Sequence, residues 1–223
     1  MTLDALGTML ELEPPAPRLV AGLAERFGLR VTQEEAGDAV IAEIAYYRAH
    51  LHEGRDPEAL AALRRRCAGV LRDALPPRAR ELDPDAMAEV LLDAIRFSAY
   101  PDAAPALRAL RDRGLVLVAI SNWDVSLHEQ LAATGLTGLL DAAVSSAEVG
   151  AAKPDPAIFA HALGRVGIPA EAALHVGDDV VADAEGARAA GLRAVLIDRV
   201  GGAVAPSGVA TIASLAELET ACA

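Results

Sequence analysis

The chain has 223 residues and a formal net charge of −12 at pH 7, so its field would repel nucleic acid and anionic membrane surfaces, and we expect neither as a partner. Its two cysteines have no metal-ligand spacing, its apolar runs are far too short to span a bilayer, and acidic residues interrupt the start where a signal peptide would be apolar. We therefore expect a cytoplasmic protein with one large domain, or one domain and a smaller insert.

From residue 16 to residue 97 the pattern is helical almost throughout. Apolar residues recur at the spacing of a helix face: Leu19, Val20, Leu23, Phe27, Val40, Ile41, Ile44 and Tyr47. Breaks rich in Gly, Pro or Asp fall at residues 28–32, 54–57 and 76–84. Thr32 and Glu35 form a capping box, and Asp56 is an N-cap followed by a first-turn proline. The pattern predicts a block of about four helices.

After residue 98, short apolar strands alternate with helices that end on glycine. The expected strands are residues 115–120, 142–146, 173–176 and 193–197. This alternation is typical of βαβ units and a parallel sheet, so the fold class is α/β. With residues 1–3 as the first strand, the helical block becomes an insertion. We expect a core domain of residues 1–13 and 98–223, and an inserted domain of residues 14–97.

Polar residues follow the expected strands at their carboxyl ends, which meet at the edge of a parallel sheet where ligands bind. They are Asp4, Ser121, Asn122, Lys153, Asp178, Asp179 and, one helical turn further on, Asp183. Carboxylates in one place repel one another unless a cation binds among them. Oxygen ligands without Cys or His favour a hard ion, so these residues predict Mg²⁺. Taken alone, Asp4 would read as a solvated N-terminal residue or a helix N-cap.

Lys153 is the only lysine in the chain, against 19 arginines. A crowded site that needs a compact ammonium on a thin stem would explain this exception. Chance in a composition rich in Ala and Arg explains it equally well.

Four segments of the chain, "DALGT", "ISNWD", "AAKPDPAIF" and "HVGDDVVADAEGARAAG", occur in that order. They resemble the four motifs of the haloacid dehalogenase-like (HAD) hydrolase superfamily, and the resemblance covers the full chain. It implies a Rossmann-like core with a parallel sheet and an α-helical cap of the C1 type inserted after the first motif. Within the superfamily, the chain most resembles the group of haloacid dehalogenase-like hydrolase domain-containing protein 3. Members of that group have a similar second motif, with an aromatic residue after "SN", and a first motif without the second acid.

The resemblance implies a role for each of these polar residues. Asp4 would be the nucleophile that forms an aspartyl-phosphate, and Lys153 would neutralise charge. The phosphoryl group would be bound by other positions of the first two motifs: the loop amides around Leu6 and Gly7, Thr8, Ser121 and Asn122. Mg²⁺ would be bound by oxygens of the first and last motifs: Asp4, the Leu6 carbonyl, Asp178, Asp179 and Asp183. The substrate would be a small phosphorylated molecule, and the choice between monomer and homodimer stays open.

Leu6 departs from the first motif of phosphatases in this superfamily, DxDGT, whose second Asp acts as general acid and base. Losing such a group typically costs about 10²- to 10⁴-fold in rate, roughly 3 to 5 kcal/mol. One explanation is a substrate whose leaving group needs no proton, or another acid such as Asp124, Asp179, His50 or His52. The others are an L-2-haloacid dehalogenase, or a binding protein of the same fold that has lost catalysis.

The last motif discriminates in part between these readings. As the resemblance implies, a dehalogenase would dispense with Mg²⁺ and carry serine and asparagine there, whereas this chain has the acidic "GDDVVAD". We therefore expect a Mg²⁺-dependent phosphatase, with the dehalogenase as the alternative. A phosphonatase would need a lysine in the cap, and residues 14–97 contain none.

Overall fold

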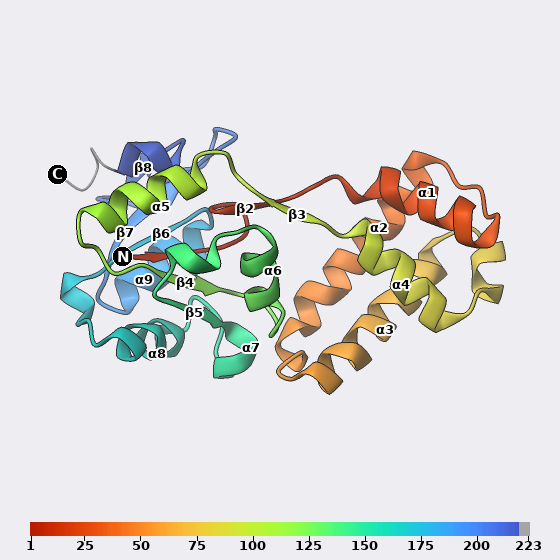
Figure 1. Ribbon diagram of the computed structural model, residues 1–223, viewed down its shortest axis with the longest axis horizontal. Coiled ribbons are helices and arrows are strands. Elements are labelled where there is room, and N and C mark those ends of the chain that lie inside the picture. The colour runs from red at the N-terminus through yellow and green to blue at the C-terminus, as the bar shows by residue number, and fades with distance from the viewer. Residues whose placement is uncertain (219–223) are drawn as a thin grey trace. The chain divides into compact units, whose positions relative to one another are not determined.

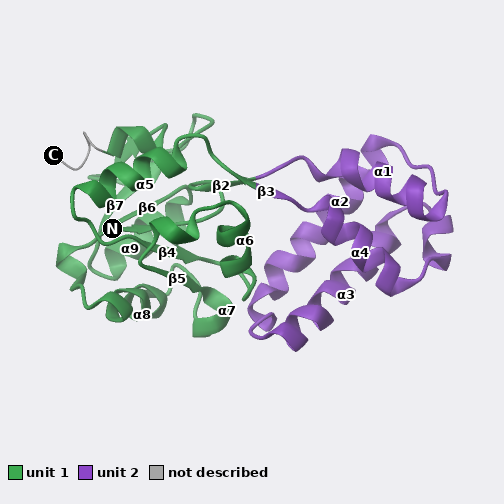
Figure 2. Ribbon diagram, viewed as in Figure 1, with its two compact units in different colours: residues 1–11, 98–223 green, residues 12–97 purple. Residues whose placement is uncertain are grey.

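The computed structural model describes residues 1–218. The chain forms two compact units, residues 1–11 with 98–223 and residues 12–97 (Figure 2). A two-stranded sheet of β2 (Leu10–Leu12) and β3 (Phe97–Ala99) lies where the chain passes from one unit to the other. These two short strands were not expected from the sequence.

The unit of residues 12–97, all of which the structure describes, contains four α-helices, as the apolar pattern predicted. They are α1 (Pro15–Phe27), α2 (Gln33–His50), α3 (Pro57–Ala74) and α4 (Pro84–Ala94). The capping box at Thr32 and Glu35 is confirmed, and Asp56 accepts the N-cap bond from the Ala59 amide at 2.9 Å. One expectation was wrong, because Ile41 is 67 % exposed.

The apolar core of this unit explains why the helices associate. Fully buried side chains from three of the described helices meet in it: Leu19, Leu23, Leu63, Leu71 and Met87. Burying a side chain of this size contributes about 1.5–3 kcal/mol, and that gain must offset the conformational entropy of ordering the helices.

The other unit is built on a parallel sheet, as predicted. Within the described residues the sheet has six strands in the order β5-β4-β1-β6-β7-β8, and every pairing in it is parallel. The strands are β1 (Thr2–Leu3), β4 (Val118–Ser121), β5 (Ala142–Ser145), β6 (Leu174–Gly177), β7 (Arg193–Ile197) and β8 (Ala210–Ile212). Strand β8 was not expected, because two of its three residues are exposed and give no apolar run.

Strand β1 lies at the centre of the sheet although it has only two residues. Leu3 is in register with Ala119 of β4 on one side and with Val176 of β6 on the other. The Asp4 amide continues the ladder by donating to the Val176 carbonyl at 2.9 Å. Asp4 therefore leaves the sheet at its carboxyl edge, between the ends of two neighbouring strands.

Helices cover both faces of this sheet. They are α5 (Ala103–Asp112), α6 (Leu127–Ala133), α7 (Ser146–Val149), α8 (Pro156–Val166) and α9 (Gly186–Ala189). Figure 1 shows α5 and α8 on opposite sides of the strands. Phe159 of α8 is fully buried against the β4 residues Val118 and Ile120, and Ala187 of α9 belongs to the same core. These apolar contacts fix the strands whose ends carry the polar residues.

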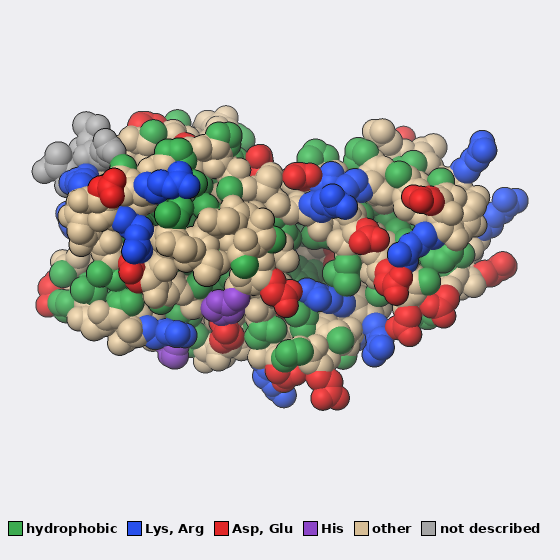
Figure 3. All heavy atoms as spheres, in the orientation of Figure 1, with side chains coloured by type: hydrophobic (Ala, Val, Ile, Leu, Met, Phe, Trp, Pro, Cys, Tyr) green, Lys and Arg blue, Asp and Glu red, His purple; other side chains and the backbone are tan. Residues whose placement is uncertain are grey.

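The surface carries charges of both signs. Acidic and basic side chains are interspersed over the face shown in Figure 3, while acidic residues are in excess over the whole chain, with 32 Asp and Glu against 20 Lys and Arg. Among the described residues, every helix is too short or too polar to cross a membrane.

Asp102, at the start of α5, connects α5 to the last described segment of the chain. Its carboxylate accepts hydrogen bonds from the Ser214 hydroxyl at 2.6 Å and from the Leu215 amide at 2.8 Å, and it forms a two-pronged ion pair with Arg199. Burial alone would raise the pKa of Asp102, but these bonds outweigh burial and hold the pKa below its usual value. The ionised carboxylate is therefore the form that stabilises this corner of the fold.

We expect Asp102→Asn to lower the free energy of unfolding by about 1–3 kcal/mol at pH 7, because the lost bonds involve charged groups. Since the pKa of Asp102 is lower in the folded protein, its contribution is complete above the unfolded pKa of about 3.9 and is lost as the pH falls through the folded pKa. Urea unfolding of both proteins between pH 7 and pH 3 tests this. The difference between them should be constant from pH 7 to pH 5 and shrink below about pH 4; a difference that does not depend on pH would contradict the assignment.

Candidate active site

The carboxyl ends of three neighbouring strands bring the expected polar residues together. Asp4 follows β1, Ser121 ends β4 and Asp178 follows β6. Because β1 lies between β4 and β6, the three residues share one edge of the sheet. The Ser121 hydroxyl donates to Oδ1 of Asp4 at 2.8 Å, and both side chains are buried. The sequence prediction that these segments converge is borne out by this geometry.

Lys153 is buried between two carboxylates. Its Nζ lies 2.5 Å from Oδ1 of Asp4 and 2.5 Å from Oδ1 of Asp183, and the residue is 5 % exposed. Burial alone would lower the pKa of Lys153, but the two carboxylates outweigh it and the pKa lies above its usual value. Burial likewise opposes ionisation of Asp183, yet Lys153 and His175 hold its pKa below the usual range. The ammonium and the Asp183 carboxylate are therefore both charged.

Asn122 holds the backbone of Lys153. Its Oδ1 accepts from the Lys153 amide at 2.7 Å, and its Nδ2 donates to the Lys153 carbonyl at 2.9 Å. The Lys153–Pro154 peptide bond is cis. From the sequence we expected Asn122 in substrate binding, but its side-chain oxygen and one of its side-chain N–H groups already make these bonds. The geometry instead favours a role in placing the lysine.

His175, on β6, is a site residue that was not predicted from the sequence. Its Nε2 lies 3.0 Å from Oδ1 of Asp183, its Nδ1 lies 2.8 Å from the Thr2 hydroxyl, and the ring is fully buried. Burial lowers the pKa of His175, so the ring is neutral. Because an ionised carboxylate only accepts hydrogen bonds, we assign the proton to Nε2 and the acceptor role to Nδ1. A histidine inside the apolar run "ALHV" was the signal available in the sequence.

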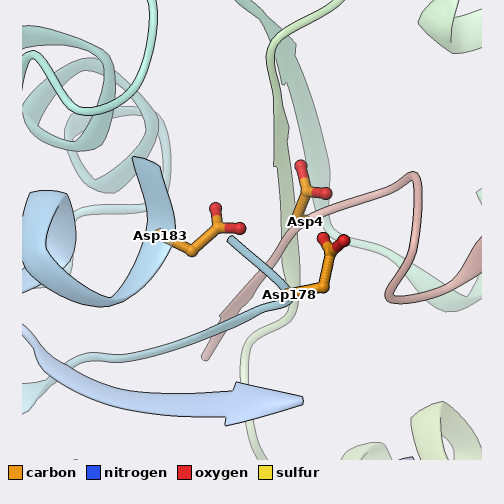
Figure 4. Close-up of side chains that lie close together, drawn as sticks. All are labelled: Asp4, Asp178 and Asp183. Atoms are coloured by element: carbon orange, nitrogen blue, oxygen red, sulfur yellow. The ribbon is translucent and has the colours of Figure 1, made fainter. Parts of the chain in front are cut away.

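Three carboxylates form a compact group, here called the acidic triad: Asp4, Asp178 and Asp183. One oxygen from each lies within 4.8 Å of the others, and Figure 4 shows the three side chains close together. Asp178 is the exposed member. Desolvation by the surrounding protein, followed by the negative charges of Asp4 and Asp183, raises the pKa of Asp178 to about 7. The three carboxylates repel one another, and their oxygens are the ligands that a hard divalent cation prefers, so the acidic triad fits such an ion.

Two glycines leave the space that the acidic triad occupies. A Cβ atom on Gly7, whose φ is +81°, would lie 2.2 Å from Oδ2 of Asp178. A Cβ atom on Gly177 would lie 2.1 Å from Cγ of Asp183. Any larger residue at either position must displace a carboxylate. The Gly7 amide donates to the Leu10 carbonyl at 2.8 Å, so it is not free for the expected contact with a phosphoryl group.

Thr8 has a buried hydroxyl without a hydrogen-bond partner among the residues that the structure describes. The residue is fully buried, and its amide makes a long bond of 3.3 Å to the Ala5 carbonyl. An unpaired buried hydroxyl is costly unless a ligand completes it. Leu6, two residues earlier, is half-buried and has no group that can exchange a proton.

Asp179 is used for local structure. Its Oδ1 accepts from the amides of Val181 and Ala182 at 2.8 and 2.7 Å, which caps a π-helical turn (Val180–Glu185), and its own amide donates to Oδ2 of Asp183 at 3.0 Å. The acidic triad does not include it. Asp179 was expected among the metal ligands, and the geometry favours a supporting role that orients Asp183.

Two of the other residues considered as proton donors, Asp124 and His50, have local partners. Oδ1 of buried Asp124 accepts from the Ser126 amide at 2.7 Å. His50 and His52 lie in the unit of residues 12–97. Nδ1 of His50 lies 2.8 Å from the Tyr46 carbonyl oxygen, and the His50 and Tyr46 rings stack with their centres 4.0 Å apart.

Comparison with known proteins identifies several relatives. The chain is 41 % identical over 138 residues to a phosphoserine phosphatase of Thermus thermophilus, a match that covers 58 % of this chain and 53 % of that protein. It is 34 % identical over 134 residues to the haloacid dehalogenase-like hydrolase domain-containing protein 3 of Mus musculus, covering 59 % of this chain and 51 % of that protein. The matches thus span about half the length of these curated relatives.

Two similar solved structures cover almost the whole chain. A HAD phosphatase from Thermococcus onnurineus has a TM-score of 0.67 and 26 % identity, covering 99 % of this chain and 96 % of that one. A 2-haloacid dehalogenase from Pseudomonas syringae has a TM-score of 0.68 and 26 % identity with the same coverage. The family model for haloacid dehalogenase-like hydrolases matches residues 1–191. Together with the parallel sheet and the residues gathered at its edge, this match shows that the chain belongs to the haloacid dehalogenase-like hydrolase family.

Proposed function

We propose that the chain is a Mg²⁺-dependent phosphatase that hydrolyses a small phosphate monoester through an aspartyl-phosphate on Asp4. The observation that carries this proposal is the position of the Lys153 ammonium, buried between Asp4 and Asp183 beside the acidic triad. Such a site holds a nucleophile, a fixed positive charge and a place for a divalent cation within a few ångströms. The phosphatases among its relatives support the same substrate class.

The acidic triad and the Leu6 carbonyl would hold Mg²⁺. The carboxylates of Asp4 and Asp178 would bind it, and Asp183 would act directly or through water. Bound Mg²⁺ would supply the positive charge that offsets the repulsion between a carboxylate nucleophile and a phosphate dianion. The absence of cysteine and histidine from this oxygen donor set suits a hard ion.

The residues around Asp4 determine which of its oxygens attacks and stabilise the phosphoryl group. Ser121 and Lys153 both bind Oδ1, so Oδ2 is the oxygen that attacks phosphorus as the ester P–O bond breaks. Lys153 and the unpaired hydroxyl of Thr8 then stabilise the charge on the phosphoryl oxygens. Water subsequently attacks phosphorus, which releases inorganic phosphate and restores the Asp4 carboxylate.

Leu6 limits this chemistry because it cannot protonate a leaving group. Esters whose leaving group is a weak base, such as nitrophenolate, depart without a proton and should be turned over more readily than alkyl phosphates. The physiological substrate would then be either an activated phosphate ester or one that brings its own proton donor.

Dehalogenation is the second candidate, and two observations favour it. Halide leaves without a proton, which suits Leu6, and a 2-haloacid dehalogenase is among the similar structures. Chloride release from 2-chloropropionate without added metal, in the absence of phosphatase activity, would establish this alternative in place of the phosphatase.

The central experiment measures p-nitrophenyl phosphate turnover with Mg²⁺ and with EDTA. We expect turnover only with Mg²⁺, and we expect Asp4→Asn to abolish it because an amide cannot attack phosphorus. Asp56→Asn is the matched control, since Asp56 is the N-cap residue before α3 and asparagine also caps helices. Turnover by Asp4→Asn equal to that of the wild type would exclude Asp4 as the nucleophile.

Leu6→Asp should restore a general acid and base. We expect hydrolysis of an alkyl phosphate such as glycerol phosphate to rise by about 10²- to 10⁴-fold relative to hydrolysis of p-nitrophenyl phosphate. Leu6→Asn, which has the same shape but no exchangeable carboxyl proton, is the control. If both variants show the wild-type ratio of glycerol phosphate to p-nitrophenyl phosphate hydrolysis, another group supplies the missing acid.

Gly177→Ala should disrupt the site, because its Cβ would lie only 2.1 Å from the Asp183 carboxyl carbon. We expect turnover to fall by about 10²-fold through displaced catalytic groups. Gly37→Ala on α2 is the control, since a Cβ there meets no atom within 4 Å, and alanine favours the helix by about 1 kcal/mol. Thermal unfolding and kcat together distinguish a local effect from general destabilisation.

A further inference from the structure

We infer that Arg199 is a positioning residue for the reaction, acting through the backbone of Thr8. The inference rests on the proposed function, in which the Thr8 hydroxyl binds the phosphoryl group. Arg199 lies two residues after β7, in a part of the chain that none of the four motifs includes. Its Nη2 donates to the Thr8 carbonyl at 2.6 Å.

Arg199 is itself held in place by its contacts with Asp102, Tyr100 and the Thr8 carbonyl. Arg199 and these three groups are here called the Arg199 cluster. Nη1 and Nη2 each lie 3.1 Å from one oxygen of Asp102. The guanidinium carbon lies 3.7 Å from the centre of the Tyr100 ring. The Arg199 and Asp102 side chains are 14 % and 18 % exposed. A planar, forked cation is required for these contacts together, and lysine could not reproduce them.

The Arg199 cluster fixes the end of the turn that follows Asp4. Arg199 binds the Thr8 carbonyl, and the Tyr100 amide binds the next carbonyl, that of Met9, at 3.0 Å. The bond from Arg199 is shorter than the 3.3 Å bond that the Thr8 amide makes to Ala5. It is therefore the stronger restraint on the Thr8 backbone.

The position of the Thr8 backbone determines where its hydroxyl points. That hydroxyl is fully buried and unpaired among the described residues, so no side-chain bond orients it before a substrate binds. A threonine side chain has a single torsion and few allowed rotamers, so a fixed backbone restricts its oxygen to few positions. Holding the carbonyl thus prepares the hydroxyl for the phosphoryl oxygens, and a small misplacement would weaken catalysis.

A double-mutant cycle tests this coupling with p-nitrophenyl phosphate and Mg²⁺. We expect Arg199→Met to lower kcat by about 10- to 100-fold and to change KM by less than about threefold. If Arg199 acts through the Thr8 hydroxyl, the double variant Thr8→Ala, Arg199→Met should have the kcat of Thr8→Ala within about twofold. The inference would be overturned if the fold-losses in kcat of the two single variants multiplied in the double variant, or if Arg199→Met had the wild-type kcat.

A second measurement does not depend on turnover. Hydrogen exchange of the peptide covering residues 4–12 should be faster in Arg199→Met than in the wild type, because the amides of Thr8, Met9 and Leu10 all donate to Ala5 within this turn. The control is Arg188→Met, since the exposed Arg188 also donates to a backbone carbonyl, that of Ser207 at 3.1 Å. Equal exchange in Arg199→Met and Arg188→Met would contradict the inference.

Two further outcomes remain decisive. If Arg199→Met does not fold, Arg199→Lys keeps the charge and one donor, and we expect intermediate kcat and intermediate exchange; wild-type values of both would overturn the inference. If the wild type itself shows no turnover, the proposed function has failed, and the exchange measurement alone then decides whether Arg199 holds the turn.

Discussion

The structure of the site depends on one buried interaction, the Lys153 ammonium shared between Asp4 and Asp183. Removing three charged groups from water costs several kcal/mol for each unless they are closely paired, so neither carboxylate could be placed here without the lysine. The pairing in turn requires Asn122 to hold the lysine backbone, and His175 and the Asp179 amide to hold Asp183. Much of the carboxyl edge of the sheet is organised around this ion pair.

The same ion pair leaves the site short of positive charge. The acidic triad contributes three carboxylates and Lys153 contributes one ammonium, so two negative charges stay uncompensated when all are ionised. The effect is visible at Asp178, which makes no ion pair with the lysine and whose pKa is raised to about 7. Desolvation and the negative charges of Asp4 and Asp183 cause this rise in the pKa of Asp178. This imbalance is the physical basis for the divalent cation in the proposed function.

Local signals predicted the fold well, and long-range side-chain pairing was the part that the sequence could not show. The capping box at Thr32 and the strand at residues 193–197 are encoded by neighbouring residues, and both were predicted correctly. His175 and Arg199 were missed because their partners, Thr2 and Thr8, lie 173 and 191 residues away. Ile41 was misplaced because helical spacing alone does not say how wide the buried stripe of a helix is.

The two-residue length of β1 has a consequence for folding. A strand this short cannot persist alone, and its ladder bonds come from β4 and β6, which lie far along the chain; even the Met1 amino group bonds to a carbonyl 115 residues away, that of Val116. Bringing such distant segments together costs the conformational entropy of closing a long loop, which slows the formation of these contacts. We therefore expect Asp4 to acquire its chemical environment late in folding, and partly folded chains to carry an unreactive carboxylate.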